Sequence, residues 1–305
     1  MTNKALVLGG GGPVGIAWES GLLTGFAEAG VDLSDANFIL GTSAGSFVGA
    51  QLAMGASPAS LAAPFLAMAD APPKPKTAPS PAAAPREPAR PAPDLTVLMR
   101  KMAEAASGVR PAQAVRAEIG AWALEQNPMS EDAFIQSFGR FLAELPADAW
   151  PQKGYACTAV DAFDGSFRLW DKTAGVGLAR AVASSCSVPG VYPPVTIKGR
   201  RYIDGGMRSA VNADMATGYN LVVVVAIRVA GAAGEAAQRM RQALDGELQV
   251  LRDGGARVEL VTPDEASVAA FGPNLMDMRR RPGAARAGVI QGRADAETLR
   301  AAWNS

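Results

Sequence analysis

The fold is decided by KALVLGGGGPVG at residues 4–15 and by NFILGTSAG at residues 37–45. In the first stretch a short apolar run leads into four glycines, and helix-compatible sequence then continues over residues 15–29 up to Gly30, a natural C-cap. The second apolar run, NFIL, leads through a sharp turn into another helix, residues 44–54. Two successive strand–helix units predict neighbouring parallel strands.

The end of the chain repeats this alternation. Residues 221–227 form a nearly continuous β-branched run, which is typical of a strand buried on both faces. A helix is predicted over residues 236–251, and another strand over residues 257–261. The sequence therefore predicts an α/β protein with a mostly parallel sheet.

A hairpin is predicted before this final part of the chain. Residues 154–160 and residues 166–170 flank Asp164-Gly165, a strong turn signal between two strand-like runs. We expect an antiparallel pair at this place in the sheet, followed by a helix over residues 178–183.

The middle of the chain is interpreted as an insertion followed by helices. Nine of the twenty-three residues 71–93 are proline, a composition that indicates an extended or disordered segment. Residues 94–145 are expected to be helical, over residues 115–124 and 134–142 among others. We interpret residues 1–305 as a single domain that contains this insertion. Another helix is expected directly after Asp94, which is its expected cap. The apolar face of this helix is formed by Leu95, Leu98, Met99 and Met102.

Composition excludes several classes of mechanism. Lys and Arg total 29 and Asp and Glu total 29, so no long-range field gathers nucleic acid, and we expect no nucleic-acid partner. The sequence has no histidine, the usual general base and the commonest metal ligand, so every Ser-His-Asp, Cys-His and His-metal mechanism is excluded. Cys157 and Cys186 are too few for a disulfide framework or a zinc site.

No segment of the sequence predicts export or membrane insertion. The first apolar run stops at Gly9, too early for a secretory core. No apolar run approaches the roughly 18 residues that a membrane-spanning helix needs. We expect a cytoplasmic protein whose membrane contact, if it makes one, is local and peripheral.

Ser43 is the candidate nucleophile. It is the centre of GTSAG, which lies between a predicted strand and a predicted helix, the context of a nucleophile elbow. A turn this tight forces strained backbone angles on the serine and leaves no room for side chains two residues away, which explains Gly41 and Gly45. The alternative is that Ser43 is only the N-cap of the helix after a glycine turn.

The glycine loop allows two chemistries. Its free amides can hold the oxyanion of an acyl-transfer intermediate, or the pyrophosphate of a dinucleotide, since GGGPVG at residues 10–15 also fits G-x-G-x-x-G. The second reading expects an acidic residue at the end of the second strand. Asp32 and Asp35 precede that strand instead, so this reading lacks its second signature. A purely structural turn remains a further alternative.

Without histidine, Ser43 needs a carboxylate or a lysine to take its proton. The best-placed carboxylate is Asp204, because it ends a short apolar run and is followed by two glycines that let the chain turn towards another strand end. The alternative reading of Asp-Gly-Gly is simply a good turn.

Taken together, four motifs resemble the successive boxes of patatin-like phospholipases. The resemblance covers residues 4–54 and 154–228. The motifs are the glycine loop, GTSAG, ASSCSVPGVYPP at residues 183–194 and DGG at residues 204–206.

The resemblance implies a three-layer α/β/α fold with helices on both faces of a mostly parallel sheet. It also implies a lipid acyl hydrolase, of the phospholipase A or esterase kind, that works through an acyl-enzyme without metal or organic cofactor. The implied roles are nucleophile for Ser43, base for Asp204, oxyanion hole for the amides of Gly10, Gly11 and Gly12, and substrate contact for Pro189 and Tyr192. The prolines of that last box are explained equally well by packing and turn formation.

Two features leave the substrate and the function open. Many family members have a basic residue where this chain has Val14, which puts a preference for phospholipid headgroups in doubt. Basic residues that could touch anionic lipid, or form ordinary solvated surface, are Lys74, Lys76, Arg86, Arg90 and the cluster Arg279, Arg280 and Arg281. A nucleotide-binding or scaffold protein that uses the same glycine loop is the rival hypothesis, and the sequence gives no oligomeric state.

Overall fold

A computed structural model describes residues 3–70, 95–126, 129–227 and 235–304. The expected insertion at residues 71–93 and the expected cap Asp94 lie outside the described residues. Within the described part of the chain, no helix is long and apolar enough to cross a membrane.

The sheet has eight strands and is mostly parallel. Its order is β5-β6-β3-β2-β1-β7-β8, with β4 paired to β3 outside this path. β3, β2, β1, β7 and β8 are mutually parallel, whereas β4 and β6 run antiparallel to β3. The strands are β1 (Lys4–Leu8), β2 (Phe38–Gly41), β3 (Gly154–Asp161), β4 (Phe167–Trp170), β5 (Val195–Ile197), β6 (Arg200–Asp204), β7 (Leu221–Val225) and β8 (Arg257–Val261).

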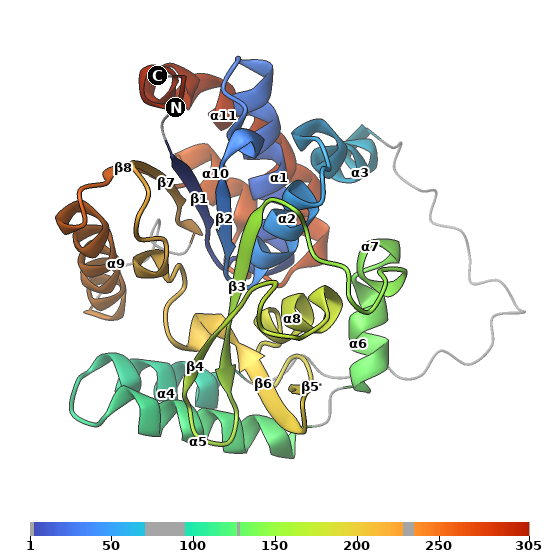
Figure 1. The fold of residues 1–305 in the computed structure, drawn as a ribbon, viewed down its shortest axis with the longest axis vertical. Coiled ribbons are helices and arrows are strands. Elements are labelled where there is room, and N and C mark those ends of the chain that lie inside the picture. The colour runs from blue at the N-terminus through green and yellow to red at the C-terminus, as the bar shows by residue number, and fades with distance from the viewer. Residues whose placement is uncertain (1–2, 71–94, 127–128, 228–234, 305) are drawn as a thin grey trace, which may run out of the picture.

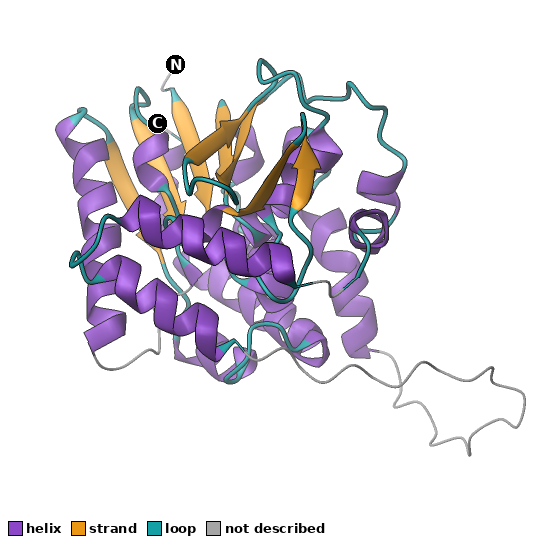
Figure 2. Ribbon diagram, turned by 90° about the horizontal axis from the view of Figure 1, so that it is seen from below, coloured by secondary structure: helices purple, strands orange, loops and turns teal. Residues whose placement is uncertain are grey.

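Helices cover both faces of this sheet (Figures 1 and 2). α1, α2, α8, α10 and α11 pack on one face, and α4, α5 and α9 pack on the other. The helices are α1 (Gly12–Glu28), α2 (Ala44–Ala53), α3 (Pro58–Asp70), α4 (Thr96–Ala106), α5 (Ala112–Glu125), α6 (Glu131–Ser137), α7 (Arg140–Ala143), α8 (Leu178–Ser185), α9 (Glu235–Asp253), α10 (Glu265–Phe271) and α11 (Arg281–Trp303). The three-layer α/β/α fold is therefore confirmed.

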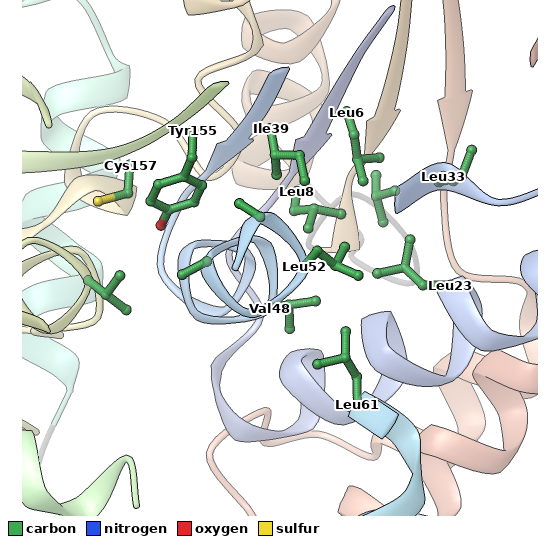
Figure 3. Packing of buried hydrophobic residues seen from close by; sticks show 14 of the residues in the cluster. Leu6, Leu8, Leu23, Leu33, Ile39, Val48, Leu52, Leu61, Tyr155 and Cys157 are labelled. Carbon is green, nitrogen blue, oxygen red and sulfur yellow. The ribbon is translucent and has the colours of Figure 1, made fainter. Parts of the chain in front are cut away.

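Successive side chains of the central strands point alternately into two separate hydrophobic cores. In β1, Leu6 and Leu8 belong to the core under α1 and α2, whereas Ala5 and Val7 belong to the core under α9. Figure 3 shows the first of these cores, where side chains of the sheet meet those of α2. All five residues of β7 are buried, as expected for a strand covered on both faces. Burying each large aliphatic side chain contributes about 1.5–3 kcal/mol.

Some predicted elements differ from the observed ones. The first helix begins at Gly12, inside the glycine loop, rather than at residue 15. The helix expected over residues 134–142 is divided into α6 and α7, because Gly139 has a φ of 74° that no helix allows. Met99, expected on the apolar face of α4, is 58% exposed. α3, β5, α10 and α11 were not anticipated from the sequence.

The tightest helix contact of the fold joins α1 to α11 through glycines. A Cβ added to Gly21 of α1 would lie 2.1 Å from the carbonyl oxygen of Ala285, and one added to Gly292 of α11 would lie 2.3 Å from that of Leu22. Only glycine allows two helix backbones to approach so closely. The approach fixes the position of α1, which carries the glycine loop at its amino end.

We expect Gly292→Ala to lower the free energy of unfolding by about 1–3 kcal/mol, because the new methyl group must push the two helices apart. Thermal and urea unfolding would measure the loss. Gly283→Ala is the matched control on the same helix, since a Cβ at that position meets nothing within 4 Å. Equal stability of the two variants would contradict the close helix contact.

Candidate active site

Ser43 lies in a strained turn between β2 and α2. Its φ of 53° and ψ of −117° lie in a region that residues other than glycine rarely adopt, and its side chain is only slightly exposed. The flanking glycines are required by space: a Cβ on Gly41 would lie 2.3 Å from Ser46 Cα, and one on Gly45 would lie 2.1 Å from Leu8 O. The elbow predicted from GTSAG is present, with its glycines in the expected role.

The glycine loop lies directly beside the nucleophile. A Cβ on Gly10 would be 3.3 Å from Ser43 Cβ, and the amide of Gly45 donates to Gly9 O at 3.1 Å. Loop and elbow therefore form one unit at the carboxyl ends of β1 and β2.

The amides of this loop are not equivalent. Gly10 N donates to Ala210 O at 2.7 Å, and Val14 N donates to Leu275 O at 3.1 Å. Gly11 N and Gly12 N, in contrast, make no hydrogen bond among the described residues. Of the three amides expected to form an oxyanion hole, Gly10 is thus already engaged, and the other two are open.

Asp204 reaches the same rim of the sheet although its strand is antiparallel. Gly41, at the end of β2, pairs with Cys157 of β3, and β3 continues beyond it to pair Ala159 with Asp204. Ser43 and Ala159 are each two residues past the Gly41–Cys157 pair. Asp204 therefore ends β6 at the level of the elbow, with β3 between them and neighbouring strands about 4.8 Å apart.

One short segment, which begins with the last residue of α8, holds both candidate residues. Ser185 Oγ accepts a hydrogen bond from Ser43 N at 3.0 Å, and Ser187 O accepts one from Asp204 N at 3.0 Å. Between them, Cys186 Sγ donates to Ser43 O at 3.1 Å. Ser43 and Asp204 are thus each bound through the backbone by residues that are two positions apart in the chain.

Buried titratable side chains lie behind Ser43 and Asp204. Burial raises the pKa of the Cys186 thiol well above its ordinary value, and the charge of Asp204 raises it further. Asp204 is 2% exposed, and its Oδ1 accepts a hydrogen bond from Gly206 N at 2.7 Å. Burial likewise raises the pKa of Glu19 in α1, whose two carboxyl oxygens have no hydrogen-bond partner among the described residues.

Aromatic side chains extend from the nucleophile along the helices that follow. Phe47 lies one helical turn after Ser43, and its ring centroid is 5.3 Å from that of Phe138. Phe138 in turn contacts Phe134, which stacks on Tyr192 at 4.5 Å. Burial and the nearby Cys186 raise the pKa of the Tyr192 phenol. Of the two residues expected to contact substrate, Tyr192 belongs to this aromatic row. Pro189, three residues earlier in the chain, is buried.

A separate cavity of about 590 Å³ lies where α6 and α7 meet the start of α8. It contains neither dyad residue and no residue of the glycine loop. The residues around it include Ile135, Leu142, Pro146 and Arg180. In the part of the chain that the structure describes, no group of three or more His, Cys, Asp or Glu side chains could hold a metal ion.

Comparison with known families identifies the family of the chain. The family model for "Patatin-like phospholipase" matches residues 6–217, which include every candidate site residue named so far. The chain belongs to the patatin-like phospholipase family. The resemblance noted from the sequence is thus confirmed, and the protein falls within a family of lipid hydrolases.

Similar solved structures include VipD from Legionella pneumophila and the type III effector protein ExoU. VipD is 13% identical with a TM-score of 0.46, and the match covers 98% of this patatin-like chain and 67% of VipD. ExoU is 15% identical with a TM-score of 0.39, and the match covers 97% of this chain and 53% of ExoU. No curated protein is similar enough in sequence to count as a relative.

Sequence reasoning missed the groups that hold Ser43 and Asp204 in this patatin-like protein. In the sequence, Ser185 and Ser187 stand out only as part of the motif at residues 183–194. No motif points to Asn212, which contacts both the elbow and the Asp204 loop, residues 204–207. The box spacing placed the two serines near the site. No pattern in the sequence indicates that the Ser185 hydroxyl accepts a hydrogen bond from the Ser43 amide, or that the Ser187 carbonyl accepts one from the Asp204 amide.

Glu19 makes the stability of the fold depend on pH. Its folded-state pKa lies well above 4.5, so the folded protein retains one proton that the unfolded chain loses as the pH rises above about that value. The stabilising contribution is complete below the unfolded pKa and is lost as the pH rises through the folded pKa. We therefore expect Glu19→Gln to raise the melting temperature more at pH 8 than at pH 5.

Melting curves of both proteins between pH 5 and pH 8 test this expectation. Glu297→Gln, which removes an exposed carboxylate from α11, is the control and should leave the pH dependence unchanged. A constant difference between wild type and Glu19→Gln at every pH would contradict a buried, protonated Glu19.

Proposed function

We propose that the protein hydrolyses lipid carboxylic esters through a dyad of Ser43 and Asp204. The observation that carries the proposal is the segment Ser185 to Ser187, which binds the backbone of both residues at once. The strained elbow supports it as well, because strain of about 1–3 kcal/mol at one residue persists where the surroundings enforce it, and such residues cluster at active sites. Residues 1–305 act as one hydrolase domain in this proposal.

In the first step, Ser43 Oγ attacks the ester carbonyl while its proton passes to the carboxylate of Asp204. The amides of Gly11 and Gly12 receive the negative charge of the tetrahedral intermediate. Ala44 N, which follows the nucleophile and donates to no described residue, is the third proposed donor. Removing one such donor typically costs about 3–4 kcal/mol of barrier.

The intermediate then collapses and the alcohol leaves with the proton held by Asp204, so that an acyl-serine remains. In the second half, Asp204 takes a proton from water as the water oxygen attacks the acyl carbonyl. The C–O bond to Ser43 breaks, Ser43 Oγ regains the proton, and the carboxylic acid is released. An aspartate is a weak base for a hydroxyl, so the proposal relies on fixed amides and exact placement more than on basicity.

The aromatic row is the proposed site for the acyl chain. Phe47, Phe138, Phe134 and Tyr192 form a continuous apolar path that starts one helical turn from the nucleophile. A hydrocarbon chain on such a path loses contact with water, which stabilises binding by about 0.8 kcal/mol for each CH₂ group. Val14, buried where many family members have a basic residue, offers no charge to a headgroup phosphate.

The hydrogen bonds of the glycine loop disfavour the rival nucleotide-binding function. The amides of Gly9, Gly10 and Val14 already donate to Val225, Ala210 and Leu275, so a pyrophosphate would find few of the loop's donors open.

The basic cluster, a candidate for contact with anionic lipid, is partly engaged within the protein. Arg279 forms an ion pair with Asp277, and the Arg281 guanidinium lies over the Phe65 ring.

We expect a fluorophosphonate probe to label the wild-type protein at Ser43. Ser43→Ala should abolish labelling, and Asp204→Asn should slow it by at least about 1,000-fold, since members of a catalytic unit each carry most of its rate enhancement. Intact-protein mass spectrometry and hydrolysis of p-nitrophenyl esters measure both effects.

The controls for this experiment are Ser60→Ala and Asp245→Asn, which remove an exposed hydroxyl from α3 and an exposed carboxylate from α9. Both should label at the wild-type rate. Equal labelling of wild type and both dyad variants would overturn the proposed hydrolase, and stabilisation by nucleotides would then favour the rival function.

Loss of the Tyr192 ring should change chain-length preference. We expect Tyr192→Ala to lower kcat/KM for p-nitrophenyl esters of long acyl chains by about tenfold while changing that for acetate little, because only long chains reach the aromatic row. Tyr219→Ala is the control, since that ring stacks on Phe38 at 5.3 Å, outside this row. A uniform loss across all chain lengths would contradict the assigned acyl path.

A further inference from the structure

The residues that follow the Asp204 loop contact the glycine loop, the elbow and the Asp204 loop itself. Gly10 N of the glycine loop donates to Ala210 O at 2.7 Å. Thr42 Oγ1, next to the nucleophile, donates to Val211 O at 3.1 Å. Asn212, the next residue, reaches both the elbow and the Asp204 loop with its side chain. Three consecutive residues thus join segments that are far apart in the sequence.

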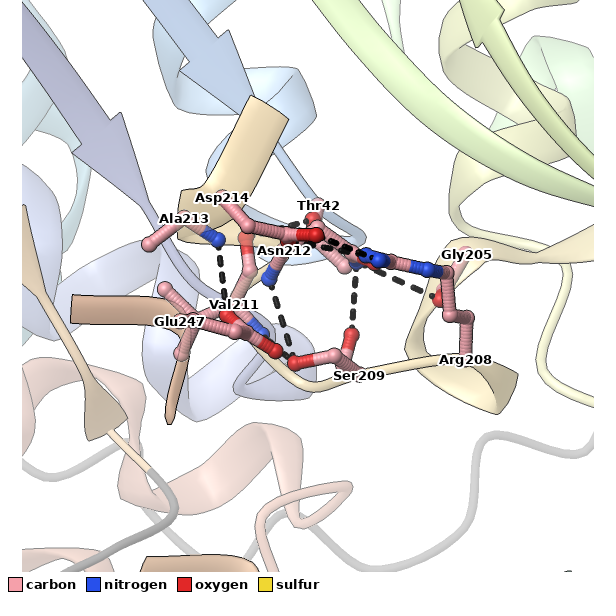
Figure 4. A network of polar contacts seen from close by, with 9 residues as sticks. All are labelled: Thr42, Gly205, Arg208, Ser209, Val211, Asn212, Ala213, Asp214 and Glu247. Carbon is pink, nitrogen blue, oxygen red and sulfur yellow. Dashed lines mark hydrogen bonds and ion pairs between the residues drawn. The ribbon is translucent and has the colours of Figure 1, made fainter. Parts of the chain in front are cut away.

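Asn212 makes the most extensive of these contacts (Figure 4). Its Nδ2 lies 3.1 Å from Thr42 Oγ1, 3.4 Å from Gly205 O and 2.7 Å from Ser209 O. Its Oδ1 accepts from Arg208 Nη1 at 2.8 Å, and because an arginine only donates, this bond fixes which end of the amide faces the elbow. The two N–H groups of the amide therefore face three acceptors: Ser209 O at the shortest distance, then Thr42 Oγ1 and Gly205 O, which belong to the neighbours of Ser43 and Asp204.

The surroundings hold this side chain rigidly. Asn212 is fully buried and adopts the left-handed conformation, with φ of 57° and ψ of 36°, which asparagine tolerates better than most residues. Arg208 is held by an ion pair with Asp214 and lies 4.7 Å over the Phe167 ring. Ser209 Oγ accepts from Asn212 N at 3.2 Å. Few rotations are left to the amide.

We propose that Asn212 is a positioning residue that sets the alignment of Ser43 Oγ with the Asp204 carboxylate. It touches neither substrate nor the reacting atoms in this proposal; it acts through Thr42 and Gly205. The inference rests on the proposed function, because it concerns the same dyad. Thr42 Oγ1 also lies 2.9 Å from Thr158 Oγ1, so the elbow is bound to β3 at the same point.

Alignment matters for this dyad because proton transfer needs donor and acceptor within hydrogen-bond reach. A displacement of about 1 Å can cost about 100-fold in rate. Loss of the Asn212 bridge should therefore lower kcat, while KM, which depends on the aromatic row, should change little.

Two variants test the role. Asn212→Gly removes the side chain and keeps the left-handed backbone at no steric cost, and Asn212→Asp keeps the shape but replaces both N–H donors by an acceptor. The matched control is Asn220→Asp, the same chemical change in an exposed residue at the amino end of β7. Each protein is reacted with a fluorophosphonate probe, and the rate constant and the final labelled fraction are measured together with kcat, KM and the melting temperature.

We expect both Asn212 variants to label to the same final fraction as wild type, with a rate constant and kcat about 10- to 100-fold lower and KM within about twofold. A lower labelled fraction with an unchanged rate constant would mean that Asn212 only supports folding, and would overturn the role. Wild-type rates in both variants would overturn it too. If wild type itself is not labelled at Ser43, the proposed function fails, and the role of Asn212 fails with it.

Discussion

The close approach of the elbow to the end of β1 is the contact on which the rest of the site depends. Gly45, at the start of α2, lies so near Leu8 that any side chain there would collide with the Leu8 carbonyl. This approach forces Ser43 into its strained backbone conformation and places it against Gly10. A strain of about 1–3 kcal/mol is small beside the burial of α2 and the sheet, so the fold can enforce it.

Once the elbow is fixed, the remaining groups reach it from three directions. The end of α8 and the residues just beyond it supply Ser185 and Ser187, β6 brings Asp204 past the end of β2, and the residues after Asp204 return to bind the glycine loop. Most of these contacts use backbone atoms or short side chains. Such groups have few rotamers to lose, so the site is ordered at a low cost in conformational entropy.

Much of the sheet could be predicted from the sequence, because its signals are local. β1 and β8 begin and end where their apolar runs do, and the strand predicted from residue 221 is present as β7. The hairpin at Asp164-Gly165 was equally readable, since its turn residues have a direct conformational reason. Ser43 could be identified from the GTSAG turn, and Asp204 because the sequence has no histidine and this carboxylate is followed by two glycines.

Other features depend on contacts that no local pattern reveals. α11 was not anticipated: its apolar residues alternate with glycines and alanines, which give a weak periodic signal but a close backbone contact in the folded chain. Met99 fits a helical apolar face yet remains exposed, because α4 meets its neighbours with Leu98 instead. The engagement of Gly10 by Ala210 is also a tertiary contact, so the sequence could not distinguish Gly10 from Gly11 and Gly12.

The glycine contact between α1 and α11 has a consequence for charge stabilisation. α11 lies beyond residues 6–217, the part of the chain that matches the family. Because its backbone rests directly on that of α1, α11 resists tilting or sliding of α1 in the proposed reaction, in which negative charge develops at the amino end of α1. The dipoles there hardly need to reorganise during reaction, which is the condition under which fixed dipoles stabilise a transition state best. In the proposed reaction, α11 thus helps to hold in place the backbone amides that stabilise the negative charge.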